Sequence, residues 1–285
     1  MNLQPRRQKL RAIINGNRCI FPGSVFDPIS ARLAADLEFD AAMLAGSIAS
    51  FTVLGAPDII VLSLTELADL AHRICRASDI PLIVDADHGY GNALSVKRTV
   101  EELESAGVSC LTIEDTRLPK PFASKSTEFL SIDEGVGKMK AALAGRQDPD
   151  LLIFGRTGAV SVNGVDDAIA RACAYAGVGV DAVMFVGVKT REELERIAAA
   201  VDIPIMLGGI PESMQDLEYL GDCGVRICLQ GHHPFNAAVQ ATYDTLKKLK
   251  EGHPPSTIGG TASSESIKRV TRDQQYQDWQ DEFLN

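Results

Sequence analysis

Eight short apolar runs, separated by helix-like stretches, constrain the fold of this chain more than any other feature. Runs of this kind are typical of parallel strands buried on both faces, and their alternation with helices indicates repeated βα units. The predicted strands are Cys19–Val25, Ala41–Ala45, Leu82–Asp85, Cys110–Glu114, Leu151–Arg156, Ala182–Val186, Pro204–Leu207 and Arg226–Gln230.

Helical periodicity fills the stretches between these runs. Thr190 and Glu193 have the spacing of a capping box, and Gly107 and Gly221 stand where helices are expected to end. The predicted helices are Ile29–Leu37, Thr65–Ala77, Ala93–Ala106, Glu134–Ala144, Val165–Ala176, Arg191–Val201, Ser213–Gly221 and Pro234–Lys250.

Eight βα units favour an α/β fold of the (β/α)₈ or TIM-barrel type over residues 1–250. The alternative is an open, doubly wound sheet, but the Gly-x-Gly-x-x-Gly turn expected after its first strand is missing. Residues 251–285 begin with a linker rich in Pro and Gly, and a polar tail follows with Tyr276, Trp279 and Phe283 at helical spacing. We expect this C-terminal helix to extend from the barrel, and to pack on its own barrel or on a partner subunit.

Composition and charge restrict the partners. The net charge of −10 argues against nucleic acid, and the chain lacks the roughly 18 consecutive apolar residues of a membrane span. Residues 1–15 lack the apolar core of a signal peptide and are predicted to form an amphipathic helix. The six cysteines are scattered, without a Cys-x-x-Cys pair. This indicates a reduced, cytoplasmic protein and argues against zinc as the metal.

Polar side chains stand at the ends of several predicted strands. Asp85 and Asp87 follow the third strand, Glu114 ends the fourth and Arg156 ends the fifth. Active sites of such barrels lie at this carboxyl-terminal face, and neighbouring carboxylates suit a hard cation such as Mg²⁺. The other strand-end residues are Gly46, Ser47, Asp115, His232 and His233.

Each of these residues also has a structural interpretation. Asp85 and Asp87 could cap a helix or pair with Arg156, and Glu114 could be an ion-pair partner within the barrel. Ser47 could open the following helix, and His232 could be a core histidine whose hydrogen bonds are satisfied.

Together the residues predict binding of an α-keto acid. A divalent cation on the carboxylates would polarise the keto oxygen, and Arg156 offers a planar fork for a carboxylate. Backbone N–H groups near Gly46 and Ser47 could bind the same carboxylate. The cation would then stabilise an enolate as a bond at C3 breaks.

These motifs resemble the isocitrate lyase/phosphoenolpyruvate mutase superfamily over roughly residues 10–250. The resemblance implies a (β/α)₈ barrel, Mg²⁺ (with Mn²⁺ as an alternative), a keto-acid or enolpyruvate substrate, and a homotetramer whose last helices are exchanged between subunits. The matching segments are Phe26–Arg32, Gly46–Ser47, Gly55–Asp58, Asp85–Asn92, Ile113–Asp115 and Gly155–Thr157.

Within the superfamily, the loop at residues 116–127 lacks the cysteine and histidine of the isocitrate and methylisocitrate lyases. The loop, together with Phe26-Asp-Pro, Glu134–Lys138 and Gly231-His232, most resembles the bacterial oxaloacetate decarboxylase branch. Two departures lie near the substrate: Gly158 replaces the usual asparagine, and residues 207–212 lack the tyrosine found after strand seven.

The resemblance implies roles for individual residues. Asp85, Arg156 and His232 are the expected catalytic residues, Gly46, Ser47, Arg156 and His232 the expected substrate contacts, and Asp85, Asp87 and Glu114 the expected metal site. We therefore expect Mg²⁺-dependent decarboxylation of oxaloacetate or a close 2-keto diacid. The alternatives are phosphoenolpyruvate or phosphonopyruvate chemistry, cleavage of a substituted malate such as methylisocitrate, and a barrel that binds a keto acid without turnover.

Overall fold

Eight parallel strands in chain order form one sheet in the computed structural model, which describes residues 3–285. Each strand pairs with the next one along the chain, so the sheet is built from successive βα units. The strands are β1 (Gly23–Ser24), β2 (Ala42–Leu44), β3 (Leu82–Asp85), β4 (Cys110–Glu114), β5 (Leu152–Thr157), β6 (Ala182–Phe185), β7 (Ile205–Leu207) and β8 (Val225–Cys228).

Ile20 closes the sheet into a barrel. It forms a parallel bridge with Ile227 of β8, in which the Ile20 N–H donates to the Arg226 carbonyl at 3.0 Å and the Cys228 N–H donates to the Ile20 carbonyl at 3.0 Å. The predicted barrel is confirmed. The first strand is shorter than the predicted Cys19–Val25, because Pro22 has no N–H to donate and separates the bridge to β8 from the pairing of Gly23 with β2.

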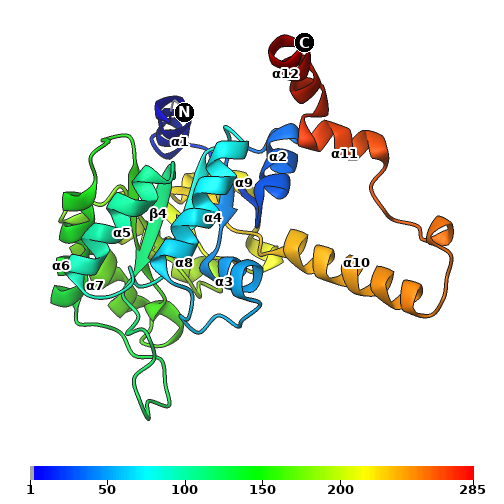
Figure 1. Ribbon diagram of the computed structural model, residues 1–285. Helices are drawn as coiled ribbons and strands as arrows, with labels where there is room; N and C mark the ends of the chain where they lie inside the picture. Colours follow the sequence, from blue (N-terminus) through cyan, green and yellow to red (C-terminus); the bar gives the residue numbers. More distant parts are fainter. Residues whose placement is uncertain (1–2) are drawn as a thin grey trace.

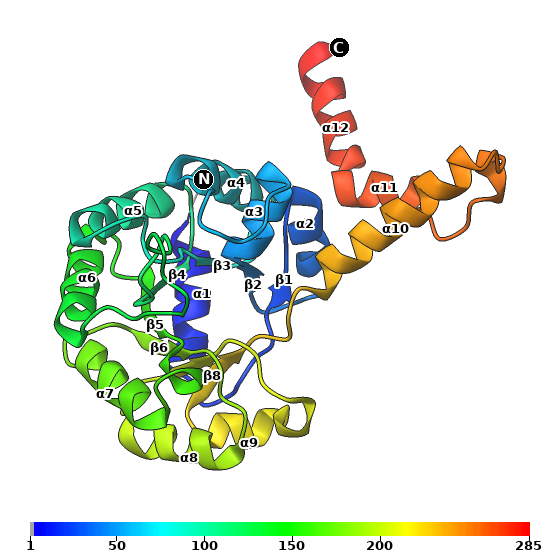
Figure 2. The ribbon, with the colours of Figure 1, turned by 90° about the horizontal axis from the view of Figure 1, so that it is seen from below.

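Helices surround the barrel on the outside, as Figure 2 shows in a view along its axis. The helices of the barrel are α2 (Pro28–Asp36), α3 (Gly46–Leu54), α4 (Leu64–Ala77), α5 (Ala93–Ser105), α6 (Ile132–Gly145), α7 (Val165–Ala176), α8 (Arg191–Ala200) and α9 (Leu217–Asp222), with short 3₁₀ turns at Ala159–Ser161 and Glu212–Met214.

The barrel has two apolar layers, because side chains of a strand point alternately inward and outward. Met43, Ile83 and Phe154 belong to the inner cluster. Leu44, Val84 and Ile153 belong to the outer cluster between the strands and the helices. All six of these residues are buried, so the barrel is a packed scaffold and its chemistry is confined to its open end.

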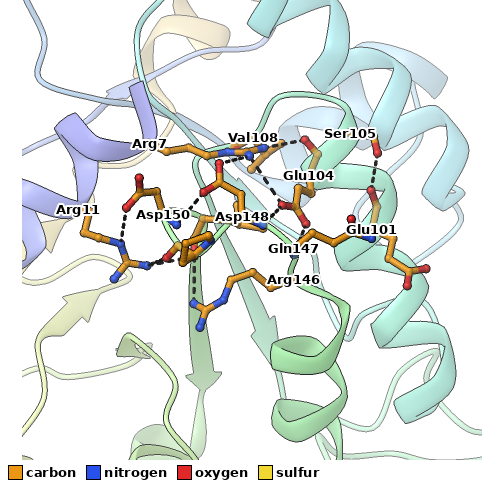
Figure 3. A network of polar contacts seen from close by, with 12 residues as sticks. Arg7, Arg11, Glu101, Glu104, Ser105, Val108, Arg146, Gln147, Asp148 and Asp150 are labelled. Atoms are coloured by element: carbon orange, nitrogen blue, oxygen red, sulfur yellow. Dashed lines mark hydrogen bonds and ion pairs between the residues drawn. The ribbon is translucent and has the colours of Figure 1, made fainter. Parts of the chain in front are cut away.

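Helix α1 (Gln4–Ile14) covers the amino-terminal end of the barrel (Figure 1). Leu10 and Ile13 join the inner apolar cluster. Arg7, which is buried, donates to the carbonyls of Val108 at 3.0 Å and Glu104 at 2.7 Å, and to the carboxylate of Asp148 at 2.7 Å (Figure 3). The predicted amphipathic helix is therefore a plug, which leaves the carboxyl-terminal end of the strands as the open face.

Helix α10 (His233–Lys250) follows β8 but does not cover its own barrel. It has no buried residue and projects away from the barrel (Figures 1 and 2). The extension predicted for residues 251–285 therefore begins earlier, at His233. The division of the chain at residue 250 stays a prediction.

The tail returns to the barrel after α10 and a 3₁₀ turn at Pro255–Thr257. Helix α11 (Ser264–Thr271) lies against α2, where Arg272 donates to Asp36 at 2.6 and 2.9 Å and Arg32 donates to the Val270 carbonyl at 3.1 Å. Helix α12 (Asp273–Leu284) has no buried residue. Exchange of these helices between subunits stays a prediction. Among residues 3–285, no helix is long and apolar enough to cross a membrane.

Candidate functional site

Three neighbouring strands bring the central polar residues together at the open end of the barrel. In the register of the sheet, Asp85 of β3 lies beside Thr112 of β4, and Glu114 of β4 lies beside Arg156 of β5. The strands are parallel, so their carboxyl ends meet at one edge. Asp85 and Glu114 are buried.

Arg156 lies directly against Asp85. Its Nη1 donates to both carboxylate oxygens of Asp85 at 2.7 Å, and its Nη2 lies 3.7 Å from Oε2 of Glu114. Thr112 also donates to Asp85 at 3.2 Å, and Thr116 donates to Glu114 at 2.8 Å. The ion pair that we considered from the sequence is therefore present, and it is part of the site.

Asp87 approaches the amino end of α3, which begins with Gly46. A Cβ at residue 46 would overlap the Asp87 carboxylate, so only glycine permits this approach. Ser47 is the second residue of α3 and does open that helix, as its structural interpretation proposed. This position also brings the N–H groups of the first helical turn to the open end of the barrel.

Burial and crowding of negative charge change the titration of this cluster. Burial, followed by the charges of Asp85 and Glu114, raises the pKa of Asp87. Burial also raises the pKa of Glu114, although Arg156 opposes this shift. Loss of solvent and the Asp85 charge raise the pKa of Asp58, on the loop after α3. The site therefore gathers more carboxyl groups than its one guanidinium can stabilise in the ionised form.

His232 lies at the end of β8, immediately before α10. Its Nδ1 is 3.1 Å from the Ser24 hydroxyl at the end of β1, which leaves Nε2 free for another partner. Burial lowers the pKa of His232, while the negative charge of Asp85 acts in the opposite direction. A neutral imidazole that can donate or accept a hydrogen bond is the form that this environment favours.

Asp115 does not belong to the site, although it follows Glu114 in the sequence. Its carboxylate accepts from the Tyr175 hydroxyl at 2.6 Å and from Arg171 at 3.1 Å, and the residue is fully buried. Adjacent residues on a strand point to opposite faces. Asp115 therefore stabilises the contact between β4 and α7, behind the barrel wall.

Glycines line the side of the open end formed by the loops after β6, β7 and β8. Gly187, Gly208, Gly209 and Gly231 contribute to a cavity of about 410 Å³ there. The residue at 209 has a φ of +122°, which disfavours any side chain. Beside Gly158, an added Cβ would meet only the Phe129 ring, at 3.8 Å. The segment without tyrosine therefore leaves space on this side, and Gly158 leaves space beside Phe129.

Ser24, Thr112 and Thr116 are polar contacts of the site that our sequence interpretation missed. Ser24 and Thr116 stand at or just after strand ends, so the same reasoning that found Glu114 could have found them. Thr112 lies inside a strand, and only the register of β3 with β4 brings it to Asp85.

The residues of the cluster fit a hard divalent cation. Asp85, Asp87 and Glu114 are buried oxygen donors, and among residues 3–285 only Arg156 forms ion pairs with any of them. A divalent cation would offset this excess negative charge. In the same part of the chain, no three His, Cys, Asp or Glu side chains are grouped closely enough to hold a metal directly.

Comparison with known proteins places this site in a family. A family model described as phosphoenolpyruvate phosphomutase matches residues 10–250. The chain belongs to this family. A relative from Bradyrhizobium diazoefficiens, named oxaloacetate decarboxylase, is 56% identical over 273 residues, which cover 96% of this chain and 95% of the relative. The resemblance inferred from the motifs is confirmed, including the branch.

Solved structures of other family members share the whole architecture. Phosphonopyruvate hydrolase in complex with oxalate and Mg²⁺ has a TM-score of 0.86 at 27% identity, covering 98% of this chain and 99% of that one. Oxaloacetate acetylhydrolase has a TM-score of 0.84 at 27% identity, covering 96% and 97%. The similarity extends over the C-terminal helices as well as the barrel.

Proposed function

We propose that this protein is a carboxy-lyase that decarboxylates oxaloacetate, or a close 2-keto diacid, to pyruvate and CO₂ with the help of Mg²⁺. The observation that carries the proposal is the meeting of Asp85, Asp87, Glu114 and Arg156 at one edge of the barrel. The support from outside the structure is the relative of 56% identity named oxaloacetate decarboxylase.

Arg156 is the residue that we assign to the carboxylate next to the keto group. Its Nη1 contacts Asp85, while among residues 3–285 its Nη2 forms no hydrogen bond and lies 3.7 Å from Glu114. A guanidinium with unused donors suits a second, planar carboxylate. The first-turn N–H groups of α3, at Gly46 and Ser47, would bind an oxygen of the same group.

Asp85, Asp87 and Glu114 would hold the cation, with Asp85 as the direct ligand and Mn²⁺ as an alternative metal. When bound, the cation supplies positive charge beside the keto oxygen, where negative charge develops as the C3–C4 bond breaks. The electron pair of that bond forms a C2=C3 double bond as the keto oxygen takes up the negative charge, and the departing carboxylate leaves as CO₂. A proton from water then adds to C3 and completes pyruvate.

His232 is assigned to the departing carboxylate. Ser24 fixes one ring nitrogen, so the other can donate a hydrogen bond to this group without holding it as firmly as an arginine would. We place a C3 substituent of the substrate toward the glycine-lined cavity beside β7 and β8. We therefore propose that substituted oxaloacetates are also accepted.

Purified enzyme with Mg²⁺ should release pyruvate and CO₂ from oxaloacetate above the spontaneous rate. EDTA should abolish this activity, and so should the substitution Asp85→Ala. A parallel screen with phosphonopyruvate, phosphoenolpyruvate and 2-methylisocitrate distinguishes the other reactions of the superfamily. Turnover of one of these in place of oxaloacetate, or undiminished activity in EDTA, would contradict the proposal.

We also propose a cytoplasmic homotetramer built from dimers that exchange their last helices, beginning with α10. All six cysteines are free thiols, which supports a reducing compartment. Exposed apolar residues Val239, Leu246 and Leu249 lie on α10. An apolar cavity of about 490 Å³ lies between α2 and the start of this chain's α10, lined by Ile29, Leu33, Pro234 and other residues. The helix of a second copy would cover this side of α2.

A further inference from the structure

Lys138 of α6 is a buried lysine that the proposed chemistry does not use. Its exposed fraction is 3%, and among residues 3–285 no carboxylate forms an ion pair with it. Its ammonium donates to one protein group, the carbonyl of His88, at 2.7 Å. Burial of an unpaired charge costs free energy of folding. The presence of a lysine at this buried position therefore requires an explanation.

The carbonyl that Lys138 contacts belongs to the loop that carries Asp87. Asp87 and Tyr90 have φ values of 47° and 59°, and Gly89 has a φ of 75°. Left-handed backbone is unfavourable for residues other than glycine and persists only when surrounding contacts hold it. This loop therefore depends on external hydrogen bonds for its shape.

Three successive carbonyls of the loop each accept one hydrogen bond from a different element. The Glu114 N–H of β4 donates to the Asp87 carbonyl at 2.8 Å. Lys138 of α6 donates to the His88 carbonyl at 2.7 Å, and the Thr99 hydroxyl of α5 donates to the Gly89 carbonyl at 3.0 Å. Lys138 provides the only charged donor of the three, and charge-assisted hydrogen bonds are the stronger kind.

We infer that Lys138 is a positioning residue for the metal site: it holds the Asp87 loop from behind, so that Asp87 stays beside Asp85 and Glu114. The inference rests on the proposed function only for the identity of the cation. Lys138 acts through the backbone at residue 88 and touches neither substrate nor cation.

The sign of its effect on metal binding distinguishes this role from simple electrostatics. Lys138 carries a positive charge near the carboxylates, so removal of that charge alone should make the site more attractive to a cation. Loss of a support for Asp87 should instead weaken cation binding. Substitution of residues that orient metal ligands typically costs about ten- to a hundredfold in affinity.

The test is the substitution Lys138→Met, which keeps the length of the side chain but removes its charge and its hydrogen bond. We expect the dissociation constant for Mn²⁺, measured on metal-free protein by titration calorimetry, to rise about tenfold or more. Amide hydrogen exchange should become faster at residues 87–91. Lys140→Met is the matched control, because Lys140 is exposed on the same helix and should leave both measurements unchanged.

Lys138→Arg retains a charged donor and should recover part of the Mn²⁺ affinity, and it keeps the inference testable if the methionine variant does not fold. Unchanged or tighter Mn²⁺ binding in Lys138→Met would overturn the inference. It would also be overturned if Lys138→Arg bound Mn²⁺ no more tightly than Lys138→Met. None of these measurements uses decarboxylation, so the inference can stand or fail separately from the proposed reaction.

Discussion

At the scale of single residues, Arg156 must contact two carboxylates, one of the protein and one of the proposed substrate. It neutralises Asp85 in the absence of substrate, and in the proposed reaction it also binds a carboxylate. The geometry of its fork therefore matters more than its charge. Lysine carries the same charge as a single point and cannot contact two groups in this planar way.

Arg156→Lys should therefore lower kcat/KM for oxaloacetate by about ten- to a hundredfold, which corresponds to the roughly 1.5–3 kcal/mol of one charge-assisted hydrogen bond. The affinity for oxalate, measured as a competitive inhibition constant, should fall in the same variant. An oxalate affinity equal to that of the wild type would show that Arg156 only supports the fold.

His232 should affect the two ligands differently. His232→Ala should lower kcat/KM for oxaloacetate far more than it lowers the affinity for oxalate, since oxalate has no C4 carboxylate. Steady-state kinetics with oxalate as inhibitor provide both values from one protein. Equal losses for the two ligands would mean that His232 shapes the metal site instead.

The residue scale is also where sequence reasoning reached its limit. The strand ends of a barrel converge, and a buried charge there must be paired or bound to a ligand. This reasoning identified Asp85, Glu114 and Arg156. Lys138 could not be identified, since its partner lies 50 residues away in the chain and nothing local distinguishes it from the exposed Lys140. Asp115 follows Glu114 at a strand end, and only the alternation of faces along β4 excludes it from the site.

At the scale of elements, strand order and most helices followed from hydrophobic periodicity, because each βα unit buries its own apolar face. Helix α3 was expected only through Ser47 at its start, and its bounds were not predicted, since its apolar composition has no clear polar face. The departure of α10 from the barrel was also missed. Its sequence has an ordinary amphipathic pattern, and periodicity identifies an apolar face without identifying what covers it.

The docking of α11 on α2 includes the ion pair between Arg272 and Asp36, and the Asp36 carboxyl titrates. The hydrogen bond from Arg272 lowers the pKa of Asp36. A carboxyl whose pKa is lowered on folding contributes stability above its unfolded pKa of roughly 3.9, and loses that contribution as the pH falls through the folded value. The contact should therefore be intact at neutral pH and weaken only in acid.

Asp36→Asn should reproduce the acid state at pH 7, because it removes the charge but keeps the shape of the side chain. Amide hydrogen exchange should become faster in residues 264–272 and remain unchanged in the strands. Asp69→Asn, which disrupts an exposed ion pair with Arg73 on α4, is the matched control. Equal protection of α11 in wild type and Asp36→Asn would show that apolar contacts of Val270 alone hold the helix.

At the scale of the whole molecule, the chain exposes an apolar side of α2 and an apolar stripe on α10. Leu246→Glu should place a charge on that stripe and shift the protein from the proposed tetramer to smaller species. Light scattering coupled to size-exclusion chromatography measures this change, with Lys247→Glu as a control on the neighbouring position. A monomeric wild type would contradict the proposed exchange of α10.

The projection of α10 has a further consequence for each barrel. If a helix from another chain covers α2, folding and association are coupled in one equilibrium. Dilution would then favour dissociation and unfolding. The midpoint of thermal unfolding would then rise with protein concentration, as mass action requires. Two variants that cannot associate, one substituted on α10 and the other on α2, would form one wild-type interface per dimer when mixed. The catalytic residues come from one chain, but the stability of the fold that holds them would depend on association with other copies.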